Sequence, residues 1–197
     1  FNFGAGNTSS VDLYVINIER ARYKDHLFLT TFNLQLSELT SSAQQLPFGA
    51  NSIVLTNNSN NVSTVTYCDA GRVYDIVSGS NGTATTSSIT PNITPGYTVS
   101  GSYGWYLPDI GVILLNPRAL ALPYASGGVN IQPYSTQVTT TNNSDLTGPS
   151  GSVMKLFQSI SGSLTSGSFQ INSEENITSD YVFVRPRSSE FNYSENP

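Results

Sequence analysis

The segment from Gly101 to Leu122, GSYGWYLPDIGVILLNPRALAL, constrains the fold more than any other part of this chain. Its run Ile110–Leu115 is apolar without alternation, which predicts a strand covered on both faces. Asn116 and Pro117 predict a helix start, because asparagine caps free backbone N–H groups and proline fits the first helical turn. Pro123 should end that helix after one or two turns. The segment predicts a structural centre of the fold and carries no pattern typical of catalysis.

Other strand candidates are rich in β-branched and aromatic residues and are separated by turn-rich links. They cover residues 11–18, 26–36, 52–56, 62–67, 72–77, 168–172 and 181–185, with a weaker candidate near 129–138. The best hairpin joins Val62–Tyr67 to Arg72–Val77 through the short turn Cys68–Gly71. Within residues 26–36, Phe28 shares a parity with the later apolar residues, so that we expect it to face the core.

A second short helix, capped by Ser152, is favoured over a strand for residues 153–160. Its apolar residues recur at helical spacing; they are Val153, Leu156, Phe157 and Ile160. The elements together predict a mainly β fold, an antiparallel β-sandwich or barrel with one or two short helices and long polar loops or arms.

The 197 residues are expected to form a single β-rich domain, since this length suffices to bury a sizeable core. Residues 1–10 are predicted to form an arm, and the polar segments 78–100 and 125–152 to form loops or arms. The chain begins with Phe1 and stops within an aromatic-bearing segment, which suggests a piece of a longer polypeptide.

Charge is sparse: 11% of the residues are charged, less than half the usual share of about 25%. The formal net charge is −5, with eight basic residues. A nucleic-acid binder needs clustered Lys and Arg, and so does a protein that docks on anionic lipid. We therefore predict neither a nucleic-acid nor a membrane partner.

A single histidine, His26, and a single cysteine, Cys68, restrict catalysis. A Cys–His dyad needs contact and a lowered thiol pKa, whereas the adjacent Asp69 would raise it. A Ser–His–Asp triad would also need His26, and no GxSxG motif is present. Zinc, iron and calcium sites lack their ligand patterns, and no cofactor is predicted.

Paired carboxylates for glycoside cleavage remain an open alternative, because acidic residues distant in sequence can converge in space. The candidates are Asp12, Asp69, Asp75, Asp109 and Glu190. Each is more simply explained as an acid in a turn or at a strand edge. The prediction is that the chain is not an enzyme.

Two further alternatives concern sugars. Rings interleaved with Asn and Ser can form a carbohydrate-binding surface, and the candidates are Tyr103, Trp105, Tyr106 and Tyr124. Asn-x-Ser/Thr sequons would be glycosylated in a secreted protein. They occur at Asn7, Asn57, Asn61, Asn81, Asn92, Asn142, Asn176 and Asn192. A chain so rich in Asn, Ser and Thr also produces such triplets by chance.

Four segments occur in an order that suggests a family. They are VINIERARYKD from Val15, GRVYDIV from Gly71, YLPDIGVILLNP from Tyr106 and YVFVRPRSSEFNYS from Tyr181. In this order they resemble a class of virion structural proteins of tailed bacteriophages, especially T4-like phages of marine bacteria. The resemblance runs from about Val11 to the last residue.

That resemblance implies a building block of the virion, in the tail, baseplate or neck region. The implied partners are copies of the chain itself and other virion structural proteins, and the implied location is the phage particle, assembled in the host cytoplasm. The alternative is a carbohydrate- or receptor-binding module on a virion or cell surface, with a host glycan as partner. The candidate core or interface anchors are Tyr103, Trp105, Tyr106, Ile113, Leu115, Phe183, Phe191 and Tyr193. The resemblance implies no catalytic residues.

Overall fold

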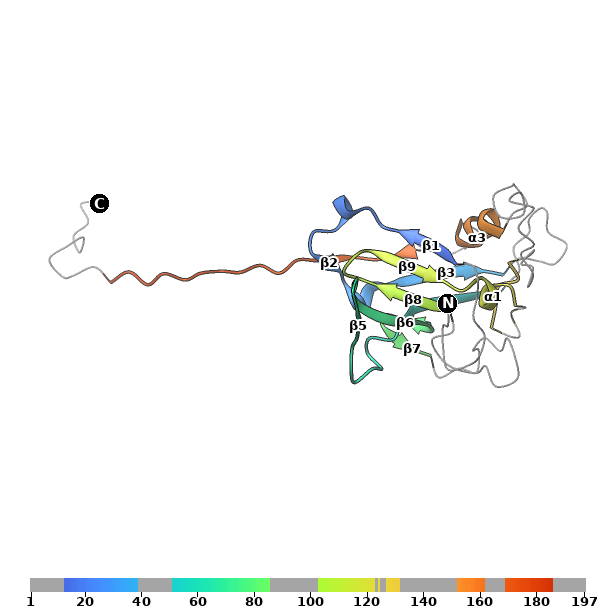
Figure 1. The fold of residues 1–197 in the computed structure, drawn as a ribbon, viewed down its shortest axis with the longest axis horizontal. Helices are drawn as coiled ribbons and strands as arrows, with labels where there is room; N and C mark the ends of the chain where they lie inside the picture. The colour runs from blue at the N-terminus through green and yellow to red at the C-terminus, as the bar shows by residue number, and fades with distance from the viewer. Residues whose placement is uncertain are drawn as a thin grey trace, which may run out of the picture.

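A computed structural model describes residues 13–38, 51–85, 103–122, 124, 127–131, 152–161 and 169–185 (Figure 1). The predicted arm over residues 1–10, residues 86–100 and 132–151, and the anchors Phe191 and Tyr193 lie outside these ranges. No helix in the described ranges is long and apolar enough to cross a bilayer.

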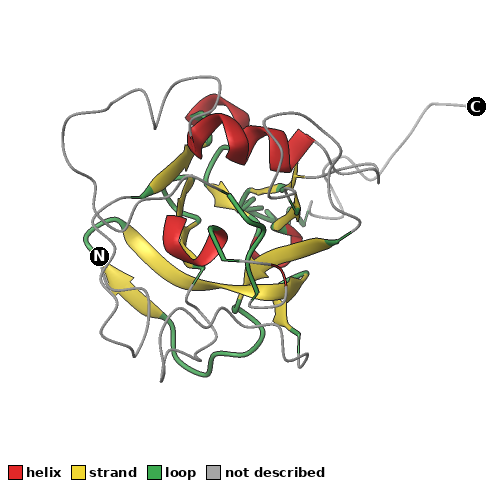
Figure 2. Cartoon of the chain, turned by 90° about the vertical axis from the view of Figure 1, so that its right-hand side faces the viewer, coloured by secondary structure: helices red, strands yellow, loops and turns green. Residues whose placement is uncertain are grey.

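The fold is mainly β, as predicted: an antiparallel sheet curls into a half-barrel, accompanied by two short helices (Figure 2). The sheet order is β1-β9-β8-β6-β4-β3-β10, and β5 and β7 also pair with β6. Its strands are β1 (Tyr14–Asn17), β3 (Asn33–Ser37), β4 (Ser52–Asn57), β5 (Thr66–Cys68), β6 (Gly71–Ser80), β7 (Thr83–Ala84), β8 (Gly104–Leu107), β9 (Val112–Leu115) and β10 (Phe169–Gln170). A separate two-stranded sheet pairs β2 (His26–Leu27) with β11 (Ser173–Glu174).

Alternation along the strands places one set of side chains inside the curl, because successive residues of a strand point to opposite faces. The inner set is apolar and forms one continuous core. At its centre the rings of Phe32 and Tyr106 are stacked, with centroids 4.8 Å apart and planes 12° apart. Of the predicted anchors, Tyr103, Tyr106, Ile113 and Leu115 are buried in this core.

The β5–β6 hairpin confirms the predicted turn: Cys68 pairs with Gly71, which leaves Asp69 and Ala70 at the tip. The loop expected from residue 78 is wrong over its first part, because β6 continues to Ser80 and β7 follows. Asn81 and Gly82 connect them with φ of 52° and 76°. Positive φ at both central residues is the tight hairpin turn that Asn-Gly favours, and it matches the twist of the strands.

The central segment forms the β8–β9 hairpin and then α1 (Pro117–Leu120). The Asn116 side chain caps the helix by accepting a hydrogen bond from the Arg118 backbone N–H at 3.0 Å, which confirms the predicted start. The expectation of a strand over residues 110–115 covered on both faces is wrong in two respects. Ile110 is an exposed turn residue, and in β9 only the face with Ile113 is fully buried.

The second predicted helix is confirmed as α3 (Ser152–Ser161), although Ser152, expected as its cap, is the first residue of the helix. Leu156 packs against the core, and the Ser159 hydroxyl donates to the Ser37 carbonyl at 2.6 Å. Phe157, however, is 60% exposed, so that its predicted place on the packed face is wrong. The buried Ser159 occupies that stripe instead, because the Ser37 carbonyl needs a donor there.

Two other predictions need correction, one of a strand and one of an arm. The predicted strand over residues 26–36 is interrupted by the 3-10 turn η2 (Leu29–Thr31), which leaves Phe28 37% exposed. The Thr56 hydroxyl donates to the Phe32 carbonyl, which supports the chain after the turn. Residues 127–131, expected within an arm, are part of the body: Val129 and Ile131 are fully buried.

Residues 181–185 are extended but pair with no strand among the described residues. They continue from β11 as a segment that points straight away from the body (Figure 1). We call residues 175–185 the arm. The sequence predicted a strand there, and the β-forming composition is present, but a sheet partner within the described chain is not.

Candidate interaction site

The outer face of the sheet carries apolar side chains across four neighbouring strands. In register, Val15 of β1 lies opposite Leu114 of β9, which lies opposite Trp105 of β8, which lies opposite Asp75 of β6. Residues directly opposite one another on a sheet are in contact distance. This row therefore forms a continuous apolar strip that ends in a carboxylate.

A groove lies over the end of this strip that contains Trp105 and Asp75. Residues 58–65 connect β4 to β5 and form one wall, and the outer faces of β5, β6, β8 and β9 form the floor. Its volume is about 430 Å³, within the range of about 300–1,000 Å³ found for ligand sites. The residues that line the groove include Asn58, Val62, Val73, Asp75, Trp105, Leu107 and Leu114.

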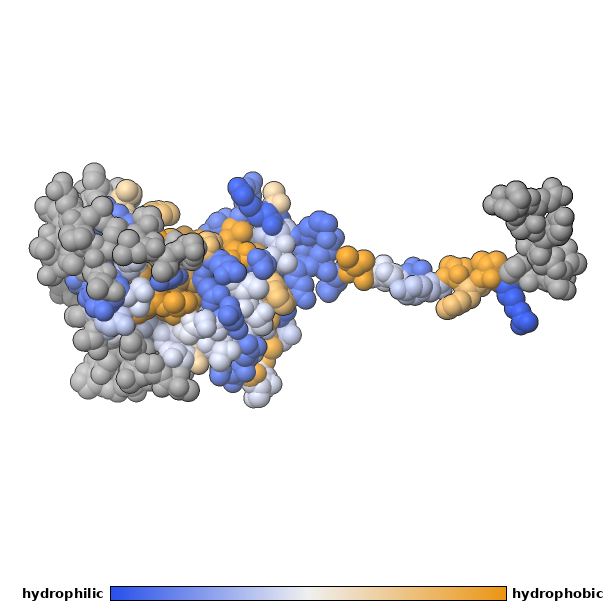
Figure 3. Space-filling model, turned by 180° about the vertical axis from the view of Figure 1, so that it is seen from behind, coloured by the Kyte–Doolittle hydropathy of each residue, from blue (hydrophilic) through white to orange (hydrophobic). Residues whose placement is uncertain are grey.

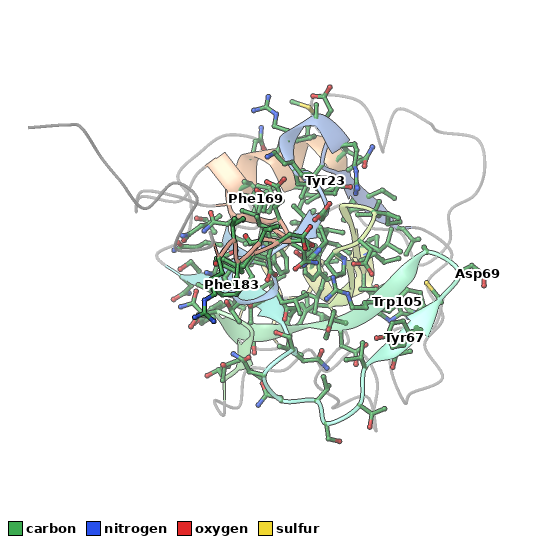
Figure 4. All side chains as sticks on the ribbon, turned by 90° about the vertical axis from the view of Figure 1, so that its left-hand side faces the viewer. Tyr23, Tyr67, Asp69, Trp105, Phe169 and Phe183 are labelled. Carbon is green, nitrogen blue, oxygen red and sulfur yellow. The ribbon has the colours of Figure 1, made fainter. Side chains whose placement is uncertain are left out.

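Trp105 occupies the floor of the groove, where it is half-buried. Trp105 is one of the predicted core or interface anchors. Its parity in β8 is opposite to that of the buried Tyr106 and directs it outward. Figure 4 shows it on the same flank of the body as Tyr67, which is 71% exposed. Trp105 therefore lines an open surface, whereas Tyr103 and Tyr106 are core residues.

Asp75 places a carboxylate in this apolar setting. Burial raises its pKa, and a long hydrogen bond from the Asn58 side chain at 3.4 Å opposes the shift. Among the described residues Asp75 makes no ion pair. A desolvated carboxylate without a cation is costly, so a cation presented at the groove would be stabilised there.

The end of the sheet beside the groove is held by a clamp between two turns. Asp109, in the β8–β9 turn, accepts hydrogen bonds from the Arg72 Nη2 at 2.6 Å, Nε at 3.0 Å and backbone N–H at 2.7 Å. Burial alone would raise the pKa of Asp109, but the hydrogen bonds and charge of Arg72 outweigh it and lower that pKa. Gly71 has φ +102°, and a Cβ there would lie 2.4 Å from the Asp109 Oδ2. The turns approach this closely because residue 71 has no side chain.

A third turn joins the same end. The Arg20 guanidinium donates to the carbonyls of Asp25 at 3.0 Å and Asp109 at 3.1 Å, and it lies 4.7 Å from the centre of the Tyr23 ring. Three segments that are distant in the sequence, residues 15–25, 71–77 and 106–117, thus meet here. Residues 19–25, which contain this turn, are exposed except for Tyr23, which is buried.

The first residues of the arm are fixed to the same region. His26 and Glu174 pair at 3.1 Å, Lys24 and Glu175 at 2.5 Å, and the Asn176 N–H donates to the Asp25 carboxylate at 3.0 Å. Beyond this root the large apolar residues are open to solvent. Their exposed fractions are Ile177 82%, Tyr181 83%, Val182 83%, Phe183 96% and Val184 82%.

The catalytic alternatives find no assembled site in the described residues. His26 pairs with Glu174, whereas the Cys68 sulfur accepts a hydrogen bond from the Ala70 N–H. Asp109 is engaged by Arg72, and within the part of the chain that the structure describes no group of three or more His, Cys, Asp or Glu residues is placed to hold a metal ion. Asp12 and Glu190 lie outside the described ranges.

Sequence reasoning identified Trp105 and Asp75 singly but missed the groove that they share. The signal for the groove was the alternation along β6. Val73 and Asp75 point to the face of the sheet opposite the one on which Tyr74 and Ile76 are buried. Comparison of the chain with protein-family models, curated proteins and solved structures finds no match.

Proposed function

We propose that this chain is a structural subunit of a tailed-phage virion, in the tail, baseplate or neck region. It acts through permanent contacts with copies of itself and with neighbouring structural proteins. The observation that carries the proposal is the apolar surface left open by the described body, on the arm and in the groove. A monomer rarely exposes contiguous apolar surface, and large patches mark interaction sites.

The charge distribution supports the same function. With 11% charged residues the chain has little of the charged surface that keeps a free monomer soluble. Interfaces between permanently associated subunits are depleted in charge and enriched in aromatic residues. The exposed Tyr67, Phe157 and Phe183 match that composition.

The roles of the resembling segments also fit a structural part. Arg20, Arg72 and Asp109 hold three backbone turns together through hydrogen bonds to carbonyl, N–H and carboxylate groups. Such residues fix the shape of one end of the sheet and the position from which the arm departs. A particle subunit needs that rigidity, because its neighbours are placed by the geometry of its surface.

Particles purified from a culture that produces this chain test the proposal. The chain should be present at a fixed copy number per particle, measured by mass spectrometry against isotope-labelled standard peptides, and should resist washing with 1 M salt (about 3 Å Debye length). A copy number that varies between preparations, or catalytic turnover by the isolated monomer, would overturn the proposal.

A carbohydrate-binding module is the second candidate, and the half-buried Trp105 in an open groove favours it. A ring whose face is accessible can stack on a sugar. Trp105→Ala would then abolish binding to a glycan array while Phe183→Ala, in the arm, would leave it intact. For the structural subunit neither variant changes glycan binding.

A further inference from the structure

The arm and the groove are chemically complementary. In an extended chain Tyr181, Phe183 and Arg185 share one face, because alternate residues point the same way. That face presents two aromatic rings followed by a cation. Figure 3 shows the exposed hydrophobic surface of the arm at a distance from the body.

The groove presents the matching surface. Its floor and wall are apolar at Trp105, Leu114 and Val62, and its boundary holds the carboxylate of Asp75. Aromatic side chains are the usual anchors of protein interfaces, where they fill pockets of this kind. The Arg185 cation lies next to the aromatic rings of the arm, and the Asp75 carboxylate lies next to the apolar lining of the groove. With the rings in the groove, the cation would therefore meet that carboxylate.

The arm is directed away from its own body. Its root is fixed by the Lys24–Glu175 ion pair and by the contact between the His26 ring and the Glu174 carboxylate, and from there it points outward (Figure 1). At about 3.3–3.6 Å per residue, residues 175–185 reach roughly 35 Å. That is about the diameter of a small domain, so that the arm can cross to the groove of an adjacent copy.

We propose that the arm of one copy docks in the groove of the next copy, with the rings of Tyr181 and Phe183 over Trp105 and with Arg185 paired to Asp75. This deepens the proposed function and rests on it, since it names one of the permanent contacts. Donor and acceptor are different surfaces of the same chain. The contact is therefore heterologous, and its repetition produces a ring or a helical stack.

The single native cysteine, Cys68, lies in the groove and provides a direct test. The unlabelled chain, which has Cys68 and no other thiol, is mixed with a ¹⁵N-labelled Cys68→Ser, Val182→Cys chain and treated with a short bismaleimide. We expect linked pairs that join residue 68 of the unlabelled chain to residue 182 of the labelled chain. The matched control is Cys68→Ser, Met154→Cys, since Met154 is also exposed but lies on α3. It should give at most a tenth of that yield.

The same chemistry separates docking on a neighbour from docking on the chain's own body. A Val182→Cys chain that retains Cys68 should form a ladder of linked copies on a denaturing gel. Linkage within single chains, without the ladder, would overturn the proposal in favour of a folded-back arm. Equal yields from the Val182 and Met154 positions would overturn it as well.

Affinity provides an independent measurement. Phe183→Ala should raise the dissociation constant of self-association about 30-fold, the usual effect of losing an aromatic hot spot. Val182→Ala, on the opposite face of the arm, should change it less than about threefold. Asp75→Asn should weaken association in the wild-type chain and have no effect once Arg185 is replaced by Gln.

Failure of this inference is distinguishable from failure of the proposed function. Particles that contain the chain at fixed copy number, with no Phe183 effect and no specific linkage, would overturn arm docking alone. Specific linkage in the purified chain, with the chain absent from particles, would overturn the virion function and leave the contact in place.

Discussion

The clamp between Arg72 and Asp109 should make the stability of the sheet depend on one carboxylate. Asp109→Asn keeps the shape of the side chain but removes its charge, and it replaces one of the two acceptor oxygens with an NH₂ group. The Arg72 guanidinium then loses its ion pair while it is still partly buried, with side chains of Arg72 and Asp109 24% and 31% exposed.

The expected loss follows from these contacts. Hydrogen bonds to charged groups contribute about 1.5–3 kcal/mol each, and the partial exposure favours the lower end. The remaining amide oxygen of the Asp109→Asn side chain can still accept the bond from the Arg72 backbone N–H. We expect the free energy of unfolding to fall by about 2 kcal/mol at pH 7, or Tm to fall by about 4–8 °C.

The pH dependence has a definite sign. The pKa of Asp109 is lowered from 3.8 in the folded chain, so its contribution is present above that value and is lost as pH falls through the folded pKa. The difference between wild type and Asp109→Asn should therefore be full at pH 7, shrink below about pH 4 and disappear at lower pH.

Asp75→Asn is the matched control, because the pKa of Asp75 is shifted in the opposite direction to that of Asp109. The pKa of Asp75 is raised by burial, so that its charged form is penalised at pH 7 and the penalty is relieved as pH falls through the folded pKa. This variant should equal or exceed wild type in stability at pH 7 and converge with it in acid.

Urea unfolding followed by circular dichroism measures all three chains at a protein concentration low enough to keep each of them monomeric, because association shifts apparent stability. An Asp109→Asn chain within about 0.5 kcal/mol of wild type at pH 7 would refute the clamp. A difference that persists unchanged in strong acid would refute its ionic origin.

The core and its surface lead to three further stability predictions. Tyr103→Phe should lower the free energy of unfolding by about 1–3 kcal/mol, because the Tyr103 hydroxyl donates to the buried Gly127 carbonyl at 2.6 Å. Tyr106→Phe should leave the free energy of unfolding unchanged or raise it, because the buried Tyr106 hydroxyl has no hydrogen-bond partner among the described residues. Trp105→Ala should reduce the free energy of unfolding by less than the roughly 3–5 kcal/mol typical of a buried ring, and Tyr106→Ala should reach that range; equal losses would show that Trp105 is a core residue. Gly71→Ala should lower the free energy of unfolding by more than about 1 kcal/mol, since residue 71 has φ +102° and a Cβ there would clash with the Asp109 side chain. A Gly71→Ala chain that unfolds at the same urea concentration as wild type would contradict this.

The sequence predicted a helix start and a turn correctly where the interactions that form them are between residues close in the chain. The Asn116–Pro117 helix start depends on a cap within two residues, and the Cys68–Gly71 turn on two neighbouring strands. The Asn81–Gly82 turn was missed although its signal is strong. Its flanking strands contain serine, threonine and glycine, and that composition is typical of a loop until the sheet is assembled.

The candidate site was harder to predict because it depends on contacts between distant segments. Nothing in the residues beside Asp109 identifies Arg72 as its partner, and the groove combines four strands with the 58–65 connection. The parity of Trp105 also could not be fixed in advance. A four-residue strand that contains Gly104 and two aromatic residues fits equally well in either orientation.

Two of the predictions that were wrong share one physical cause: each expected an apolar surface to be covered within the chain. Residues 110–115 were expected to be covered on both faces, yet the outer face of β9 is only half-buried. Residues 181–185 were expected to form a strand within a sheet, yet they have no partner in the described chain. Apolar patterns record that a surface is buried, but they do not record whether its cover belongs to the same molecule. Among the described residues, one extended segment has no sheet partner and one sheet face has no cover, and intermolecular burial would require both. The Phe183→Ala and Val182→Ala pair decides whether these two open surfaces cover each other.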